Sequence, residues 1–75
     1  MKLSEFIAEI TDFMQIETPF ELEDKLDAYT EWDSMVVLSV LALIDESFEM
    51  DASVELTKCI TFKDVVSLIS DKLEA

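Results

Sequence analysis

The stretch DSMVVLSVLALIDESFE, residues 33–49, decides the fold because its apolar side chains recur at helical spacing. We predict a helix that opens at Asp33 and Ser34 and runs to about Glu49. Its outward face is apolar at the start and acidic at the C-terminal end, where Asp45 and Glu46 lie. The opposite face supplies the core, through a predicted buried stripe of Val37, Val40, Leu41, Ile44 and Phe48.

Two further helical patterns flank this stretch. Residues 3–15 have apolar side chains at helical spacing and acidic ones on the other side, which predicts an amphipathic helix ending near Gln15. Thr61, with Asp64 three residues later, resembles a capping box and predicts the start of the last helix. The core stripe of that last helix is predicted to be Val65, Leu68, Ile69 and Leu73.

The connections between these helices differ in length. Residues 16–33 show no clean period, and a loop of this length is uncommon unless it is functional or disordered. Its apolar side chains indicate that it is pinned to the core, with a short helical turn around Leu22 to Leu26. Residues 51–57 read as a linker with a short helix, with Val54 and Leu56 facing inward. The expected fold is all-α: one domain over residues 1–75, a small four-helix bundle of three longer helices and a short third one, with a long loop after the first helix.

Composition narrows the function classes. The net charge is −13, from eighteen acidic residues against five lysines, in a chain that is 51% hydrophobic and has no glycine. This charge repels nucleic acid and anionic membranes and attracts basic protein surfaces, although it also serves simply to keep a small apolar-rich protein soluble. The longest nearly apolar stretch, residues 35–44, is about half of the roughly 20 residues that a membrane span needs. We expect a cytoplasmic protein, monomeric, with no membrane span and no nucleic-acid partner.

Catalytic chemistry is poorly represented. Without histidine, the chain lacks the zinc sites of zinc fingers and the Ser-His and Cys-His catalytic pairs. Its single cysteine, Cys59, excludes an internal disulfide and is expected to be a small core residue among apolar neighbours. No Asp-x-Asp-x-Asp-Gly calcium loop is present. We therefore expect no metal site and no enzymatic activity.

The informative constellation is Trp32-Asp33-Ser34-Met35, where the long loop meets the second helix. A serine at a helix N-terminus exposes its hydroxyl beside unpaired backbone N–H groups, and the helix dipole there favours a phosphate joined to the serine oxygen. The alternative is that Asp33 or Ser34 caps the helix and does nothing more. On a bare Asp-Ser-Met tripeptide, capping is the better reading.

The surroundings of this tripeptide resemble the acyl carrier protein family. In that family Asp-Ser-Leu or Asp-Ser-Met at the start of the second helix holds a modified serine. The run Ile44-Asp45-Glu46-Ser47-Phe48 is similar to the family's close of the second helix, and Leu56 followed by Ile60-Thr61-Phe62-Lys63-Asp64-Val65 is similar to its passage into the fourth. With the first helix included, the resemblance covers essentially the whole chain.

The resemblance implies a carrier and not an enzyme. Ser34 would be the attachment site of 4′-phosphopantetheine, derived from coenzyme A, and Asp33 the neighbour that the phosphopantetheinyl transferase expects. Acyl intermediates would be held as thioesters on that arm. They would be presented to acyl-loading and acyl-processing enzymes of fatty-acid, lipid or specialised acyl biosynthesis, which have basic or apolar docking surfaces.

The chain departs from carriers of primary fatty-acid synthesis in two places. Those carriers have glycine after the phenylalanine that closes the second helix, where this chain has Glu49. A left-handed conformation there costs about 1 kcal/mol or more, so we expect the helix to end differently. They also have acidic residues at the positions of Val36 and Ser39. Either the start of the helix is buried under the loop, or it is an apolar docking surface with acidic steering; the docking residues are then Met35, Val36, Leu38, Ser39, Asp45 and Glu46.

Other functions remain open. Aminoacyl, peptidyl and polyketide carriers share the serine and the bundle, and a mostly apolar interior favours a lipid load because it can shelter part of the chain. Outside the family, the best alternative is an unmodified acidic helical adaptor that binds a basic partner through its second helix. Modification of Ser34 separates the two classes.

Overall fold

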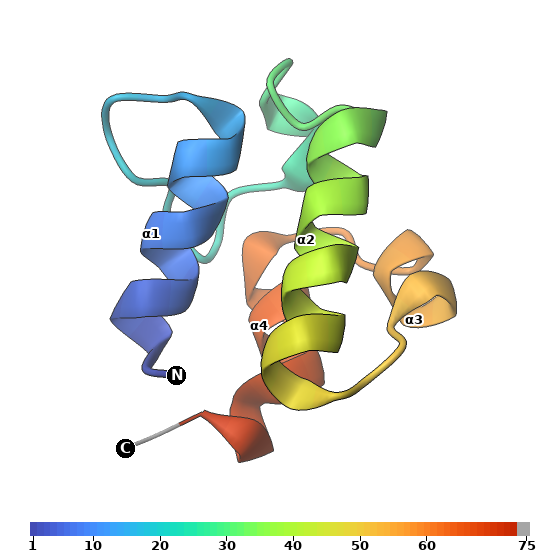
Figure 1. The fold of residues 1–75 in the computed structure, drawn as a ribbon. Helices are drawn as coiled ribbons and strands as arrows, with labels where there is room; N and C mark the ends of the chain where they lie inside the picture. Colours follow the sequence, from blue (N-terminus) through green and yellow to red (C-terminus); the bar gives the residue numbers. More distant parts are fainter. Residues whose placement is uncertain (74–75) are drawn as a thin grey trace.

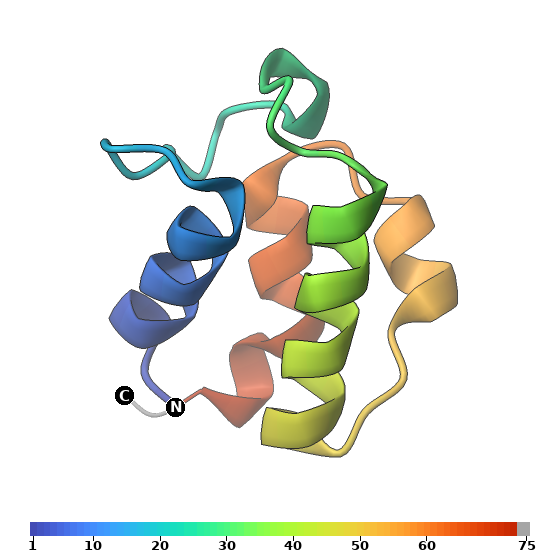
Figure 2. The same ribbon diagram turned by 45° about the horizontal axis from the view of Figure 1, so that its top comes forward.

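Helix α2, Ser34–Phe48, runs through the middle of the computed structural model, which describes residues 1–73 (Figure 1). Helix α1 (Leu3–Met14) and the short α3 (Ser53–Thr57) lie on opposite sides of α2, and α4 (Phe62–Ile69) packs behind α1 and α2 (Figures 1 and 2). Residues 1–73 thus contain four α-helices and no β-strand. The prediction that the chain is mostly helical is confirmed.

The core is built from one row of side chains on each long helix. The row of α2 consists of Val36, Val40 and Ile44, spaced four residues apart. Helices α1 and α4 supply matching rows, Phe6, Ile10 and Met14 from the first and Phe62, Val65 and Ile69 from the second. Residues four apart share a helix face, so three such rows meet in one apolar interior.

The predicted stripe of α2 is correct at Val40 and Ile44 but rotated at its start. Val36 is buried, with 5% of its surface exposed, whereas Val37 is only half-buried. Because successive residues differ by about 100° around a helix, a shift of one residue moves the stripe to the next face. Leu41 and Phe48 are also half-buried and pack at the edge of the core.

The long connection between α1 and α2 is bonded to the turn that precedes α4. The Leu26 N–H donates to the Ile60 carbonyl at 2.9 Å, the Phe62 N–H to Asp24 at 3.1 Å, and the Lys63 N–H to Leu22 at 2.9 Å. Phe20 is buried and stacks on Phe62 with ring centroids 3.9 Å apart. The expectation that this loop is pinned to the core is confirmed. Its helical turn, a 3₁₀ helix at Leu26–Ala28, begins where we expected it to end.

The start of α4 confirms the predicted capping box. The Thr61 hydroxyl oxygen accepts from the Asp64 N–H at 3.3 Å, and the Asp64 carboxylate accepts from the N–H groups of Ile60 and Thr61 at 2.9 and 3.0 Å. These backbone hydrogen bonds lower the pKa of Asp64 from its ordinary value. Since hydrogen bonding favours the charged carboxylate, the turn before α4 is held in place by Asp64.

Two helix ends adopt the left-handed conformation without glycine. Gln15, after α1, has φ 56° and Glu49, after α2, has φ 53°. The expectation that α2 ends differently is wrong: the Glu49 N–H donates to the Asp45 carbonyl at 2.9 Å, as in a left-handed C-terminal cap. This hydrogen bond offsets part of the conformational cost, which is about 1–2 kcal/mol for a residue with a side chain.

The short elements correct two further expectations. In α3, Leu56 is buried as predicted, but Val54 is 61% exposed because residues two apart point to nearly opposite sides of a helix. Helix α4 ends at Ile69 and is followed by a 3₁₀ turn, Ser70–Lys72. Leu73 therefore lies beyond α4 and packs, half-buried, against the core.

Candidate functional site

Asp33 is the N-cap of α2. Its backbone is extended, with φ −116° and ψ −176°, and its Oδ1 accepts a hydrogen bond from the Val36 N–H at 3.0 Å. Its carbonyl accepts the Val37 N–H at 3.0 Å. The capping role foreseen for Asp33 or Ser34 thus falls to Asp33. As a consequence, the fold does not need the Ser34 side chain for capping.

Ser34 is the first helical residue of α2, and its side chain is exposed. Its hydroxyl makes no hydrogen bond with any residue in 1–73, and neither do the backbone N–H groups of Ser34 and Met35. A free primary alcohol therefore lies beside two free N–H groups at the positive end of a 15-residue helix. This arrangement suits a phosphate ester on the hydroxyl oxygen.

The loop residue before this cap is held by aromatic packing. The Trp32 ring meets Phe62 edge to face, with centroids 5.5 Å apart, and the Trp32 N–H donates to the Tyr29 carbonyl at 3.2 Å. Tyr29 also meets Phe62 edge to face at 5.5 Å. Phe62 therefore supports both sides of the turn that leads to Ser34, and α4 indirectly fixes the start of α2.

A side-chain hydrogen bond fastens the same turn. The Tyr29 hydroxyl donates to Asp24 Oδ2 at 2.7 Å, and the Glu21 N–H donates to the same oxygen at 3.0 Å. The hydrogen bond from Tyr29, followed by that from Glu21, lowers the pKa of Asp24, and the bond to Asp24 raises the pKa of Tyr29. Both shifts favour the paired state near neutral pH.

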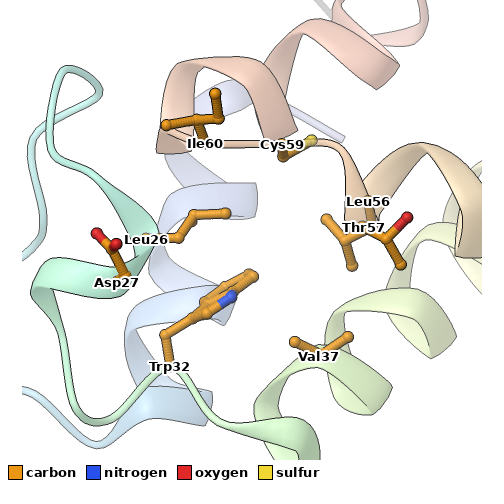
Figure 3. A pocket seen from close by; sticks show the side chains of 8 residues that line it. All are labelled: Leu26, Asp27, Trp32, Val37, Leu56, Thr57, Cys59 and Ile60. Atoms are coloured by element: carbon orange, nitrogen blue, oxygen red, sulfur yellow. The ribbon is translucent and has the colours of Figure 1, made fainter.

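Beside this turn is an open cavity of about 420 Å³ between the long loop, α2 and α3 (Figure 3). The Trp32 ring points into it, opposite Leu56 and Val37. The walls are mostly apolar; the lining residues are Leu26, Asp27, Trp32, Val37, Leu56, Thr57, Cys59 and Ile60. The cavity is therefore suited to an apolar group.

Cys59 lines this cavity and is half-buried, not enclosed in the core as expected. Its thiol donates to the Glu55 carbonyl at 3.5 Å. Burial raises the pKa of the Cys59 thiol, and the nearby Asp64 carboxylate adds to the effect. Because the thiolate is the nucleophilic form, these surroundings make Cys59 a poor nucleophile at neutral pH.

One of the residues predicted to dock partners is not at the surface. Val36 is buried in the core, so the prediction that it belongs to an exposed surface is wrong. Met35 and Leu38 are exposed, at 76% and 66%. They are neighbours on the solvent-facing side of α2, since residues three apart are adjacent on a helix surface. Further along the same side, Ser39 is half-buried, and Asp45 and Glu46 are exposed.

Acidic residues dominate the sequence on both sides of Ser34. Between positions 26 and 57 the chain has no lysine, while its eight acidic residues there are Asp27, Glu31, Asp33, Asp45, Glu46, Glu49, Asp51 and Glu55. The lysines at 25 and 58 lie just outside. Such a surface attracts basic partners at a distance.

The sequence did not indicate the Trp32 cavity. The only available signal was the set of apolar residues in the long loop. In residues 1–73, no helix is long and apolar enough to cross a bilayer, and no three metal-binding side chains lie together. Comparisons with family models, curated proteins and solved structures find no match to the chain.

Proposed function

We propose that this protein is a non-catalytic acyl carrier that bears 4′-phosphopantetheine on Ser34. In this proposal the four helices form the small four-helix bundle of carrier domains, with the long connection between α1 and α2. It also takes the chain as a cytoplasmic monomer. Its partners are a phosphopantetheinyl transferase and the enzymes that load and process acyl groups.

The observation that carries this proposal is the state of Ser34. Its hydroxyl is exposed and unpartnered within residues 1–73, while Asp33, at the N-cap position, caps the helix. A rigid turn supported by Phe62 presents this hydroxyl. The site thus has a defined position and an available oxygen, as an attachment point requires.

The attachment step needs an external enzyme. The Ser34 oxygen would form a bond to the phosphorus of the pantetheine phosphate in coenzyme A. The pyrophosphate P–O bond would break, and adenosine 3′,5′-bisphosphate would leave. Within residues 1–73 no side chain accepts a hydrogen bond from the Ser34 hydroxyl, so the base that takes its proton belongs to the transferase.

When bound, the arm supplies a thiol that holds acyl groups as thioesters. The protein's own residues offer the apolar cavity at Trp32, Val37 and Leu56, about 420 Å³ in volume, next to the turn that leads into Ser34. Its walls suit an apolar load better than a charged one, which favours fatty or other lipid acyl groups over aminoacyl groups. Tethering keeps the intermediate at high local concentration for a docked enzyme.

The test is intact mass after incubation with coenzyme A and a broad-specificity phosphopantetheinyl transferase. The native chain should gain one phosphopantetheine, with one additional titratable thiol. Ser34→Ala should gain nothing, and Ser47→Ala, which changes an exposed serine near the other end of α2, should react like the native chain. If the folded native chain gains nothing with several transferases, the carrier proposal fails and the unmodified acidic adaptor becomes the better one.

A further inference from the structure

The Trp32 ring brings a polar group into a cavity whose walls are otherwise mostly apolar. Trp32 is half-buried, and Figure 3 shows its ring pointing into the open space opposite Leu56 and Val37, with the indole nitrogen on an edge that faces this space. The edge-to-face contact with Phe62, at a centroid distance of 5.5 Å, holds the ring in place. The fold therefore fixes where the indole N–H lies.

This indole N–H is a hydrogen-bond donor that the protein does not use. It makes no hydrogen bond with any residue in 1–73. Since no sealed-off side-chain nitrogen or oxygen in these residues lacks a partner, the Trp32 nitrogen stays accessible from the cavity. An indole nitrogen can only donate, and buried tryptophans ordinarily satisfy it within the protein. An ordered but unused donor at a cavity points to an acceptor atom on the group that enters.

The other polar side chains of the cavity are already bonded or are charged. The Thr57 hydroxyl donates to the Val54 carbonyl at 2.6 Å, and the Cys59 thiol donates to the Glu55 carbonyl at 3.5 Å. Asp27 is the one charged side chain among the lining residues, and it is exposed. A carboxylate that entered would lose its water and meet a like charge, so the cavity suits a neutral group.

A fully saturated chain would satisfy the walls of the cavity but not its donor. The chain would displace water from the Trp32 N–H and supply no acceptor, and an unsatisfied donor of this kind lowers an equilibrium constant by about tenfold. A chain with an oxo or hydroxyl oxygen supplies the acceptor. Sites built to bond a polar atom reject analogues that lack it for this reason.

We propose that the Trp32 Nε1–H selects the group carried on Ser34, and that this group is a neutral acyl chain with an oxo or hydroxyl oxygen instead of a fully saturated one. The inference rests on the proposed carrier function and deepens it by naming the class of load. Trp32 and Ser34 are two residues apart, at most about 7 Å along the chain, so an arm on Ser34 begins beside the cavity. Trp32 is thus a specificity-determining residue.

The test places loads on Ser34 by chemical synthesis of the 75-residue chain, so that it does not depend on a transferase. The arm is left unloaded, loaded with a saturated acyl group of about eight carbons, or loaded with the same group bearing a ketone. The ketone is placed near the thioester, in the middle of the chain or near its end. Trp32 is the only tryptophan, so one indole N–H signal in the nuclear magnetic resonance spectrum reports on the cavity. At least one ketone position should move this proton downfield, and the saturated load should not.

A variant in which sulfur replaces the Trp32 indole nitrogen keeps the shape of the ring and removes the donor. It should lower the thermal midpoint of the chain with the responding ketone and raise that of the chain with the saturated load, each by about 5 °C. The matched control is Thr57→Val, which removes a cavity hydroxyl that is already bonded. It should leave the difference between the two loads unchanged. Circular dichroism checks that every version folds.

Three results would overturn the inference: an indole signal that moves alike for every arm, one that responds to no ketone position, or midpoints that the sulfur variant shifts in the same direction for both loads. The carrier function is judged separately, by the mass gain with the transferase. A chain that gains phosphopantetheine but shows no ketone response keeps the carrier function and loses this inference. A ketone response in the synthetic chain with no transferase reaction rejects the carrier function alone.

Discussion

Helices α2 and α4 begin alike but use their first residues differently. In both, an extended N-cap residue accepts the N–H three positions later, Asp33 from Val36 at 3.0 Å and Thr61 from Asp64 at 3.3 Å. In α4 the first helical residue, Phe62, is 1% exposed, and its N–H donates to the Asp24 carbonyl. In α2 the first helical residue is Ser34, which is exposed and has no side-chain partner in residues 1–73.

The start of α4 thus contributes its side chains to the stability of the fold, whereas the start of α2 leaves a serine hydroxyl available for reaction. At α4 the capping box, the aromatic cluster and the loop hydrogen bonds all meet, so each polar group has an internal partner. At α2 one cap suffices, and the hydroxyl beside it contributes nothing visible to stability. Polar groups that lie on a well-ordered turn but make no hydrogen bond within the protein are candidates for reaction with another molecule.

The largest effect on stability is expected at Phe62, which stacks on Phe20 and meets Tyr29 and Trp32 edge to face. Phe62→Ala should lower the free energy of unfolding by about 3–5 kcal/mol, since it removes a buried ring. Phe62→Leu, a milder change of about 1–3 kcal/mol, should keep the fold. Trp32 is the only tryptophan, so its fluorescence should shift to longer wavelength as the turn before Ser34 loosens.

The matched control is Phe48, at the far end of α2, which contacts Phe6 with ring centroids 6.3 Å apart. Phe48→Leu changes the same side chain but leaves the long loop attached to α4. Urea unfolding should show a smaller loss than for Phe62→Leu, and Trp32 emission should not move. An equal shift of Trp32 emission in both variants would show that Phe62 does not specifically support the turn.

A smaller loss of stability is expected when the hydroxyl side chain at each helix start is removed, and it should differ between α4 and α2. Thr61→Ala should lower the free energy of unfolding by about 1 kcal/mol, because the Asp64 N–H loses the hydroxyl acceptor and keeps only the Thr61 carbonyl, at 3.1 Å. Thr61→Ser keeps the hydroxyl and should lie close to the native value. Ser34→Ala should stay within about 0.5 kcal/mol of native, as expected for an exposed side chain with no contact to lose. Urea titrations of the three variants give the comparison, and a loss at Ser34 as large as that at Thr61 would contradict it.

The local features of the helix ends could be predicted from the sequence, whereas the features that depend on tertiary packing could not. The Thr61–Asp64 capping box and the end of α1 near Gln15 depend on residues within one turn, and both are confirmed. The exposed faces depend on which neighbour covers each helix. Val36 and Val37 are separated by only a 100° rotation about the helix axis. Because four of the five residues 34–38 are apolar, hydrophobicity alone does not indicate which of these two valines faces the core.

The candidate site shows the same division. Asp33 and Ser34 could be selected because their roles follow from position in the first turn. The Trp32 cavity arises where residues distant in sequence meet, such as Trp32 with Leu56. The apolar residues of the long loop indicated attachment to the core, but not that its hydrogen bonds would go to residues 60–63.

The smallest expected effect concerns how protein stability depends on pH, which the start of α4 should influence and the start of α2 should not. Backbone hydrogen bonds from Ile60 and Thr61 lower the pKa of Asp64 below its ordinary 3.8, so its contribution to stability is present above about pH 4 and is lost as pH falls through the lowered value. Between those two values the unfolded state binds more protons, so stability rises with pH there.

Asp64→Asn removes this rise, and its urea midpoint should differ most from the native one near pH 7 and least near pH 3. Protonation of the other carboxylates relieves negative charge in both chains, −13 in the native one, so the difference between the curves reports mainly on Asp64. Ser34→Ala, at the other helix start, should run parallel to the native curve throughout. If the curve of Asp64→Asn also runs parallel to it from pH 7 to pH 3, the Asp64 carboxylate does not hold the turn before α4.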